Sequence, residues 1–154
     1  MAEKYGNKVL RSVKWHMAHY WDIKRAISQR RADMSRKSSM PVGGINDSHI
    51  SDPTAQAAVS NLMPVPWVEV DGGRVSNPEK WIHVIDVVFE RLPIGEQQII
   101  RDNFWSKKGW LYVSTMRSMD KETFYRRRDH AVSMVAIVAA QEGIIKIDEK
   151  QEDG

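Results

Sequence analysis

The chain has 154 residues and no cysteine, which allows one ordinary core or two small ones and excludes disulfide bonds, thiolate metal sites and a cysteine nucleophile. Its net charge of +3 is unevenly distributed, because residues 1–37 hold ten basic against three acidic residues. No apolar run approaches the roughly 18–20 residues of a membrane helix, and the charged N-terminus lacks the apolar core of a secretion signal. We therefore expect a cytoplasmic protein with a polyanionic partner and no membrane partner.

Residues 1–36 predict one long basic helix, continuous from Tyr5 to Met34. Its apolar side chains recur every three or four residues, at Val9, Val13, Met17, Tyr20, Ile23 and Ile27. A helix with so narrow an apolar stripe must pack on the rest of the chain or on a second copy, so we expect a homo-oligomer, with a dimer favoured. The basic face is either a DNA-contacting arm or a solvated surface. The arm residues would be Lys14, Lys24, Arg25, Arg30 and Arg31.

The middle of the chain predicts a flexible linker and a small β-hairpin. Residues 37–52 are rich in Ser, Gly, Asn and Pro and lack periodicity, and Asp52 with Pro53 then predicts the start of a short helix. Residues 65–75 contain strand formers around an Asp71-Gly72-Gly73 turn, which indicates a possible small hairpin packed against helices.

Residues 53–142 predict a helical domain, and residues 143–154 an acidic tail. Asn77 and Pro78 predict a helix start, and Pro93 ends the helix with the widest apolar face in the chain. A shorter helix is expected over residues 95–105. The fold class is therefore mainly α.

Residues 109–140 predict a helix-turn-helix. An apolar helix beginning near Trp110 gives way to a polar turn at residues 117–120, where Asp120 can cap the next helix. That second helix places Phe124 and Val135 on one face and basic side chains on the other. A helix of this kind can lie on a protein core while it offers its other flank to DNA.

The second helix supplies the candidate DNA contacts. Residues in its first two turns are the candidates for base readout, with Glu122 accepting from cytosine and Arg126 donating to guanine. The base-reading set is Lys121, Glu122, Tyr125 and Arg126. The candidates for phosphate contacts are Lys107, Lys108, Thr123 and Arg127, and the stem of Arg128 can also lie along the core edge. The alternative interpretation is an amphipathic helix whose basic patch is solvated.

Several of these motifs together resemble a known family. The run Met119-Asp120-x-x-Thr123-Phe124, together with Trp110-x-x-Val113-Ser114, resembles region 4 of sigma-70-type factors. The pattern, extended to the basic N-terminal helix and to Asn77-Pro78-Glu79-x-Trp81, is similar to phage late-gene regulators of the RinA/ArpU type, from phages and prophages of Gram-positive bacteria. Where that pattern favours alanine, this chain has Ser114.

The resemblance implies a sequence-specific activator of phage late genes for packaging, structure or lysis, acting in the cytoplasm of a bacterial host. Two alternatives stay open: a small DNA-packaging subunit similar to a terminase small subunit, and a sigma-like adaptor of host RNA polymerase. No nucleophile motif points to an enzyme, and no cofactor is expected. His16 and His19 lack a carboxylate set for metal binding, and His83 with Asp86 suggests a partly buried pair.

Overall fold

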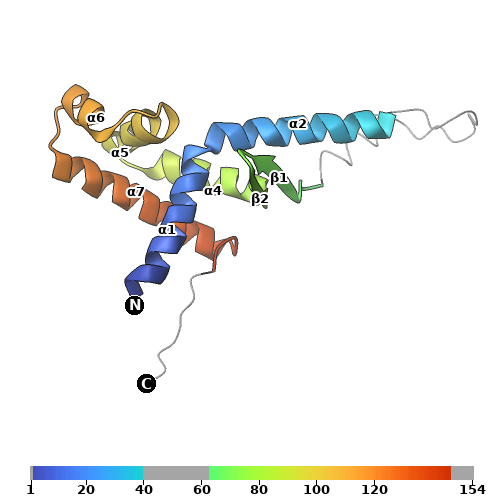
Figure 1. Ribbon diagram of the computed structural model, residues 1–154, viewed down its shortest axis with the longest axis horizontal. Helices are drawn as coiled ribbons and strands as arrows, with labels where there is room; N and C mark the ends of the chain where they lie inside the picture. The colour runs from blue at the N-terminus through green and yellow to red at the C-terminus, as the bar shows by residue number, and fades with distance from the viewer. Residues whose placement is uncertain (1, 40–62, 147–154) are drawn as a thin grey trace, which may run out of the picture. The chain divides into compact units, whose positions relative to one another are not determined.

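The structure is a computed structural model that describes residues 2–39 and 63–146 (Figure 1). It is mainly helical with one antiparallel hairpin, as predicted. The elements are α1 (Ala2–Ala18), α2 (Tyr20–Ser39), β1 (Trp67–Val70), β2 (Gly73–Ser76), α4 (Pro78–Arg91), α5 (Ile94–Ile99), the π-helix η1 (Ile100–Trp105), α6 (Trp110–Met116) and α7 (Lys121–Gln141). The helix predicted from Asp52, and the linker beyond Ser39, lie outside the described residues.

The prediction of one continuous N-terminal helix was wrong, because the helix breaks at His19 between α1 and α2. Side chains from distant parts of the chain take the carbonyls that would continue it. The Trp105 indole N–H donates to the Met17 carbonyl at 3.2 Å, and Lys107 Nζ donates to the Ala18 carbonyl at 2.7 Å. The last carbonyls of α1 are therefore satisfied by side chains, which ends the helix there.

The chain divides into two compact units. The first unit combines residues 1–21 with residues 80–154, and the second comprises residues 22–79. The helix α1 therefore groups with α5–α7 and most of α4, and most of α2 groups with the hairpin.

The second unit contains the predicted hairpin, in which β1 and β2 pair antiparallel. Val68 lies opposite Val75, and both are buried, while the turn residues Asp71 and Gly72 have φ angles of 52° and 78°. Two consecutive left-handed residues form the turn that matches the twist of a two-residue hairpin. The Asp-Gly signal therefore identified the turn correctly.

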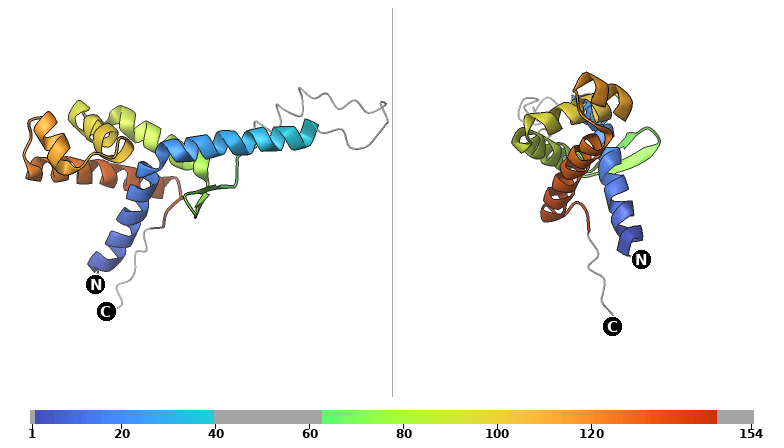
Figure 2. Two further views of the ribbon diagram at one scale, coloured as in Figure 1. Left: turned by 45° about the horizontal axis from the view of Figure 1, so that its top comes forward. Right: turned by 90° about the vertical axis from the view of Figure 1, so that its left-hand side faces the viewer.

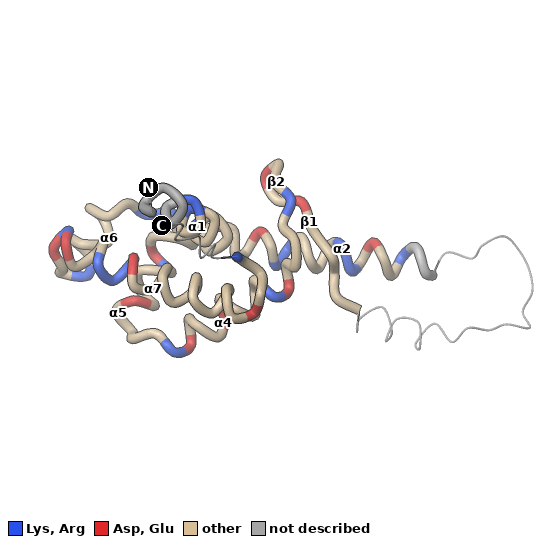
Figure 3. The backbone as a smooth tube through the Cα atoms, turned by 90° about the horizontal axis from the view of Figure 1, so that it is seen from below, with Lys and Arg blue, Asp and Glu red and all other residues tan. Residues whose placement is uncertain are grey.

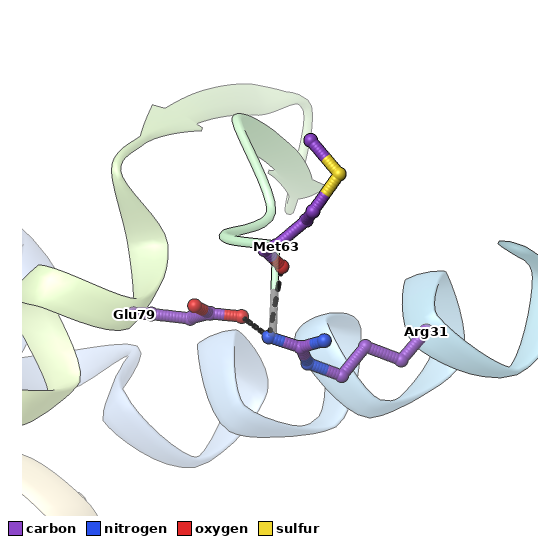
Figure 4. Close-up of polar contacts among 3 residues, drawn as sticks. All are labelled: Arg31, Met63 and Glu79. Atoms are coloured by element: carbon purple, nitrogen blue, oxygen red, sulfur yellow. Dashed lines mark hydrogen bonds and ion pairs between the residues drawn. The ribbon is translucent and has the colours of Figure 1, made fainter. Parts of the chain in front are cut away.

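Two arginines of α2 are used inside the second unit. Arg31 pairs with Glu79 and donates to the Met63 carbonyl (Figure 4). The guanidinium of Arg30 lies 4.8 Å from the ring centroid of Trp67, and that of Arg74 lies 4.1 Å from it. Both stacked arginines gain cation–π stabilisation, so Trp67 organises this end of the hairpin.

The core of the first unit forms where α1 lies across α7 (Figures 1 and 2). Val13 and Met17 of α1 are fully buried, and α4 contributes an equally buried row. Small residues let α7 come close to its neighbours. They are Ala131, Ala136 and Ala139.

An aromatic layer covers the end of α1. His16 stacks on Trp81 at a centroid distance of 3.8 Å, and His19 stacks on Trp15 at 4.2 Å. Burial lowers the pKa of His16, and the neighbouring His19 lowers it further, while the Ser12 carbonyl, which accepts from His16 Nδ1 at 2.7 Å, opposes the shift. The folded protein therefore favours the neutral form of this imidazole.

We expect acid to destabilise the first unit through His16. Because the pKa of His16 is lower in the folded state, the unfolded state takes up the proton first, so stability falls as the pH drops below the ordinary value of 6.5. Urea unfolding of the wild type and of His16→Gln at pH values from about 7.5 to 5.5 measures this, before most carboxylates titrate. The wild type should lose more stability over that range. Equal losses in both proteins would contradict the prediction.

Candidate nucleic-acid interface

Three helical elements, α5–η1, α6 and α7, pack around a small shared core. Ile99, Val113 and Phe124 are each fully buried and form one cluster, with Trp110, Met119 and Tyr125 partly buried against it. Each of the three buried residues comes from a different helix, so the cluster fixes α6 and α7 against α5. Ser114 is also buried, and its hydroxyl donates to the Leu111 carbonyl at 3.2 Å. That bond satisfies the hydroxyl at the position where the resembled pattern favours alanine.

The turn from α6 to α7 is short and tied at both ends. The Arg117 N–H donates to the Val113 carbonyl, and the Met119 N–H donates to the Ser114 carbonyl at 3.0 Å. The Arg117 side chain forms an ion pair with Asp102 of η1, with Nε and Oδ2 3.0 Å apart. That carboxylate raises the pKa of Arg117 through a hydrogen bond and its charge.

Ser118 adopts a left-handed backbone with a φ of 54°. For a residue with a side chain this conformation costs on the order of 1–2 kcal/mol, whereas glycine adopts it freely. We expect Ser118→Gly to raise the free energy of unfolding by about 0.5 kcal/mol, since glycine returns part of the gain through its more flexible unfolded state. Ser118→Val should lower it, because β-branched residues tolerate this region least. Urea unfolding of both variants measures the difference, and the reverse order would show that the turn is not left-handed in solution.

Asp120 caps α7 as predicted. Its backbone is extended, and its carboxylate accepts from the Thr123 N–H at 2.7 Å. Hydrogen bonds from the side chain and the backbone of Thr123, with a smaller contribution from the charge of Arg126, lower the pKa of Asp120. The anion also interacts favourably with the positive end of the helix dipole, so the cap stabilises the first turn of α7.

The predicted base-reading residues lie on the outer side of the first two turns of α7, with one exception. Lys121, Glu122 and Arg126 are exposed, and Lys121 Nζ lies 4.8 Å from the ring centroid of Trp110. Tyr125 is only partly exposed: its ring meets that of Phe124 edge-on at 5.1 Å and lies under the Arg128 guanidinium at 4.8 Å. Three of the four side chains are consequently available to a ligand on this face, and Tyr125 is bound partly into the core.

The residues predicted to contact phosphates make different contacts within the protein. Lys108 is exposed and lies with its Nζ 5.2 Å from the ring centroid of Tyr112. Lys107 is exposed too, but its Nζ already donates to the Ala18 carbonyl. Thr123 supplies the N–H that Asp120 accepts. The lysines precede α6 and the candidate readers begin α7, so both groups border the same pair of helices (Figure 3).

The two arginines that follow Arg126 pack against protein. The Arg127 guanidinium lies against Gly95 of α5, so closely that a Cβ at Gly95 would be 3.0 Å from Nη1. The Arg128 side chain is 22% exposed, and its Nε lies 3.7 Å from the Asp129 carboxylate. Arg128 therefore lies along the core edge, as expected from its position on the helical wheel.

The candidate arm residues are not gathered into one site within a unit. Lys14 belongs to the first unit, whereas the other four belong to the second. Arg30 stacks on Trp67, and Arg31 pairs with Glu79. The Arg25 guanidinium lies 3.5 Å from the Asp22 carboxylate. Lys24 and Arg25 are exposed.

The structure contains polar pairs that the sequence did not predict. Glu96 of α5 is buried, and its Oε1 is 2.6 Å from His130 Nδ1 of α7, which ties the two helices together. Asp86 accepts from the Tyr20 hydroxyl, and this contact, with burial as the larger cause, raises the pKa of Tyr20. The predicted His83–Asp86 pair was wrong, because His83 is exposed. The Glu96–His130 and Tyr20–Asp86 contacts each join helices that are far apart in sequence, so hydrophobic periodicity could not predict them.

Comparisons with protein-family models, with curated proteins and with solved structures find no match for this chain. Of the helices in the described part of the chain, none has both the length and the apolar character needed to cross a bilayer.

Proposed function

We propose that the protein binds double-stranded DNA at specific sequences and regulates transcription, with the first two turns of α7 in the major groove. The observation that carries this proposal is the capped, exposed start of α7 behind a short turn and a short helix. Phe124 anchors that start in the core, while Lys121, Glu122 and Arg126 stay exposed beside it. Helix-turn-helix proteins contact base edges with the N-terminal residues of their second helix.

The side chains on this face suit base readout as well as phosphate contact. An arginine donates two hydrogen bonds to guanine, and a glutamate accepts from cytosine. A face used for phosphates alone would gain nothing from Glu122, because a carboxylate repels the backbone. Lys107 and Lys108, just before α6, provide positive charge for phosphates on the flank.

The wider role follows from the sequence resemblance. It supports a phage or prophage regulator of the RinA/ArpU type that activates late genes, with host RNA polymerase as a further partner. A single helix-turn-helix contacts few base pairs, so we propose that the protein acts as a homodimer on DNA.

The test is a comparison of two duplexes of the same composition. One is recovered from a random-sequence pool by repeated selection on the protein, and the other is its shuffled version. At about 150 mM salt we expect the selected duplex to bind at least a hundredfold more tightly. Equal affinities, with a salt dependence that accounts for all of the binding, would leave only non-specific attraction to phosphates and refute the proposal.

A mass measurement separates this proposal from a packaging role. A regulator should form a complex of two copies per selected duplex. A closed ring of many copies, with or without DNA, would favour the packaging subunit instead.

A further inference from the structure

The outer face of α6 carries an unusual concentration of exposed apolar side chains. Leu111 is 64% exposed, Tyr112 48% and Met116 63%. The spacing of these residues, with the exposed Thr115 between them, places all four on one side of a seven-residue helix. In the described part of the chain, other exposed large apolar residues occur on separate elements: Trp21, Met63, Ile94 and Ile137. We call Leu111, Tyr112, Thr115 and Met116 the α6 face.

We propose that the α6 face is the contact through which two copies of this chain associate on DNA. This inference rests on the proposed function and adds to it the surface and the condition for assembly. Single exposed apolar residues are common on protein surfaces, but a contiguous group of them marks a surface that binds a partner. Phosphates are contacted by basic and polar side chains, so DNA is a poor match for Leu111 and Met116.

The size of the α6 face explains why a contact between copies would need DNA. Three side chains of this exposure offer roughly 300 Å² of apolar surface, so a pair of copies would bury about 600 Å². Stable complexes bury about 1,200–2,000 Å². The α6 face alone is therefore too small to hold a dimer in solution, but it is large enough to add affinity between copies that DNA already holds side by side.

The positive charge around the α6 face also makes a contact between two copies depend on DNA. Residues 106–121 contain four basic residues and one acidic residue, and Lys108 lies directly over the Tyr112 ring. Two such surfaces repel each other when free. Phosphates beside Lys107, Lys108 and Lys121 would neutralise that repulsion, so the contact forms on DNA and weakens away from it.

The α6 face is also self-complementary. In an antiparallel pairing about a two-fold axis, Leu111 of one copy lies opposite Met116 of the second copy, and Tyr112 lies opposite Thr115. Each large side chain then meets a flexible or a small one, as an isologous contact requires.

The experiment measures cooperativity with paired probes. Because the whole selected sequence is expected to hold two copies, the probe for one copy is a duplex of about 20 base pairs with a single half-site, and a longer duplex carries both half-sites. For the wild type we expect the second site to raise affinity per site roughly tenfold. In the double variant Leu111→Ser, Met116→Ser this gain should fall to about one, while affinity for the single site stays within about twofold. The matched control is Ile94→Ser, which changes an apolar residue that is 71% exposed on α5 and should keep the gain.

Several results would overturn the inference. These are a wild type without cooperativity, a double variant that keeps it, and a double variant that loses single-site affinity, which would place the α6 face on DNA. A stable dimer in ultracentrifugation without DNA that persists in the double variant would assign self-association to another surface. Thermal unfolding confirms that all variants are folded, which exposed substitutions should permit.

Failure of the proposed function gives a different result. If selection enriches no sequence, base readout is absent, and random duplexes of the same two lengths still measure cooperativity. If the protein binds no duplex at all, both proposals are refuted. If a sequence is enriched but the gain on two sites is absent, only the contact between copies is refuted.

Discussion

Phe124→Ala should lower the free energy of unfolding by about 3–5 kcal/mol, the largest stability effect we expect from a single change in this chain. Phe124 is fully buried and meets Ile99 and Val113, so its ring is the common contact of α5, α6 and α7. Truncation removes that apolar contact and leaves a cavity that three helices cannot all close. Since domains of this size have a free energy of unfolding of only about 5–15 kcal/mol, this loss removes a large part of it.

Urea unfolding followed by circular dichroism measures this effect. Ile137→Ala serves as the control, because Ile137 also lies on α7 but is 49% exposed, and it should change stability by less than about 1 kcal/mol. Similar losses for both variants would mean that Phe124 does not occupy a shared core. DNA affinity should fall with Phe124→Ala in proportion to the unfolded fraction.

Arg126→Ala should weaken binding to the selected duplex by roughly 1–3 kcal/mol and relax the preference at one base pair. Arg126 is exposed in the second turn of α7, on the side opposite Phe124, where a side chain in the major groove would meet a base edge. Removing it should hardly affect folding. Repeating the selection with the variant would show which base pair loses its preference.

Lys108→Ala is the matched comparison for Arg126→Ala. Lys108 lies before α6, outside the second helix, so its loss should weaken binding to selected and shuffled duplexes alike and reduce the salt dependence by about one phosphate contact. Sequence-independent losses of equal size in both variants would contradict the division between base readout and phosphate contact.

The sequence was most informative where local chemistry decides the structure. Asp120 and Thr123 predicted the cap of α7, Asp71 and Gly72 predicted the hairpin turn, and Phe124 was placed correctly on the core side. Each of these features depends on residues within a few positions of one another. The mainly helical fold follows from the same local patterns.

The sequence was least informative where distant side chains decide. The break at His19 depends on Trp105 and Lys107, which are more than eighty residues away, and the pairing of Glu96 with His130 joins α5 to α7. Both contacts appear only after the helices have packed. The same holds for the α6 face, because the sequence predicted an apolar helix beginning near Trp110, whereas only Val113 and Ser114 of α6 are buried.

An NMR titration of ¹⁵N-labelled protein with the selected duplex tests most directly the claim that α7 binds DNA. If the first turns of α7 lie in the major groove, the largest changes in backbone amide chemical shift should fall on residues 120–126, with smaller ones at Lys107 and Lys108. Amides of the hairpin at residues 67–76 should stay unchanged. Largest shifts on α2 or the hairpin, with residues 120–126 unaffected, would show that another surface binds DNA and would contradict the proposed role of α7.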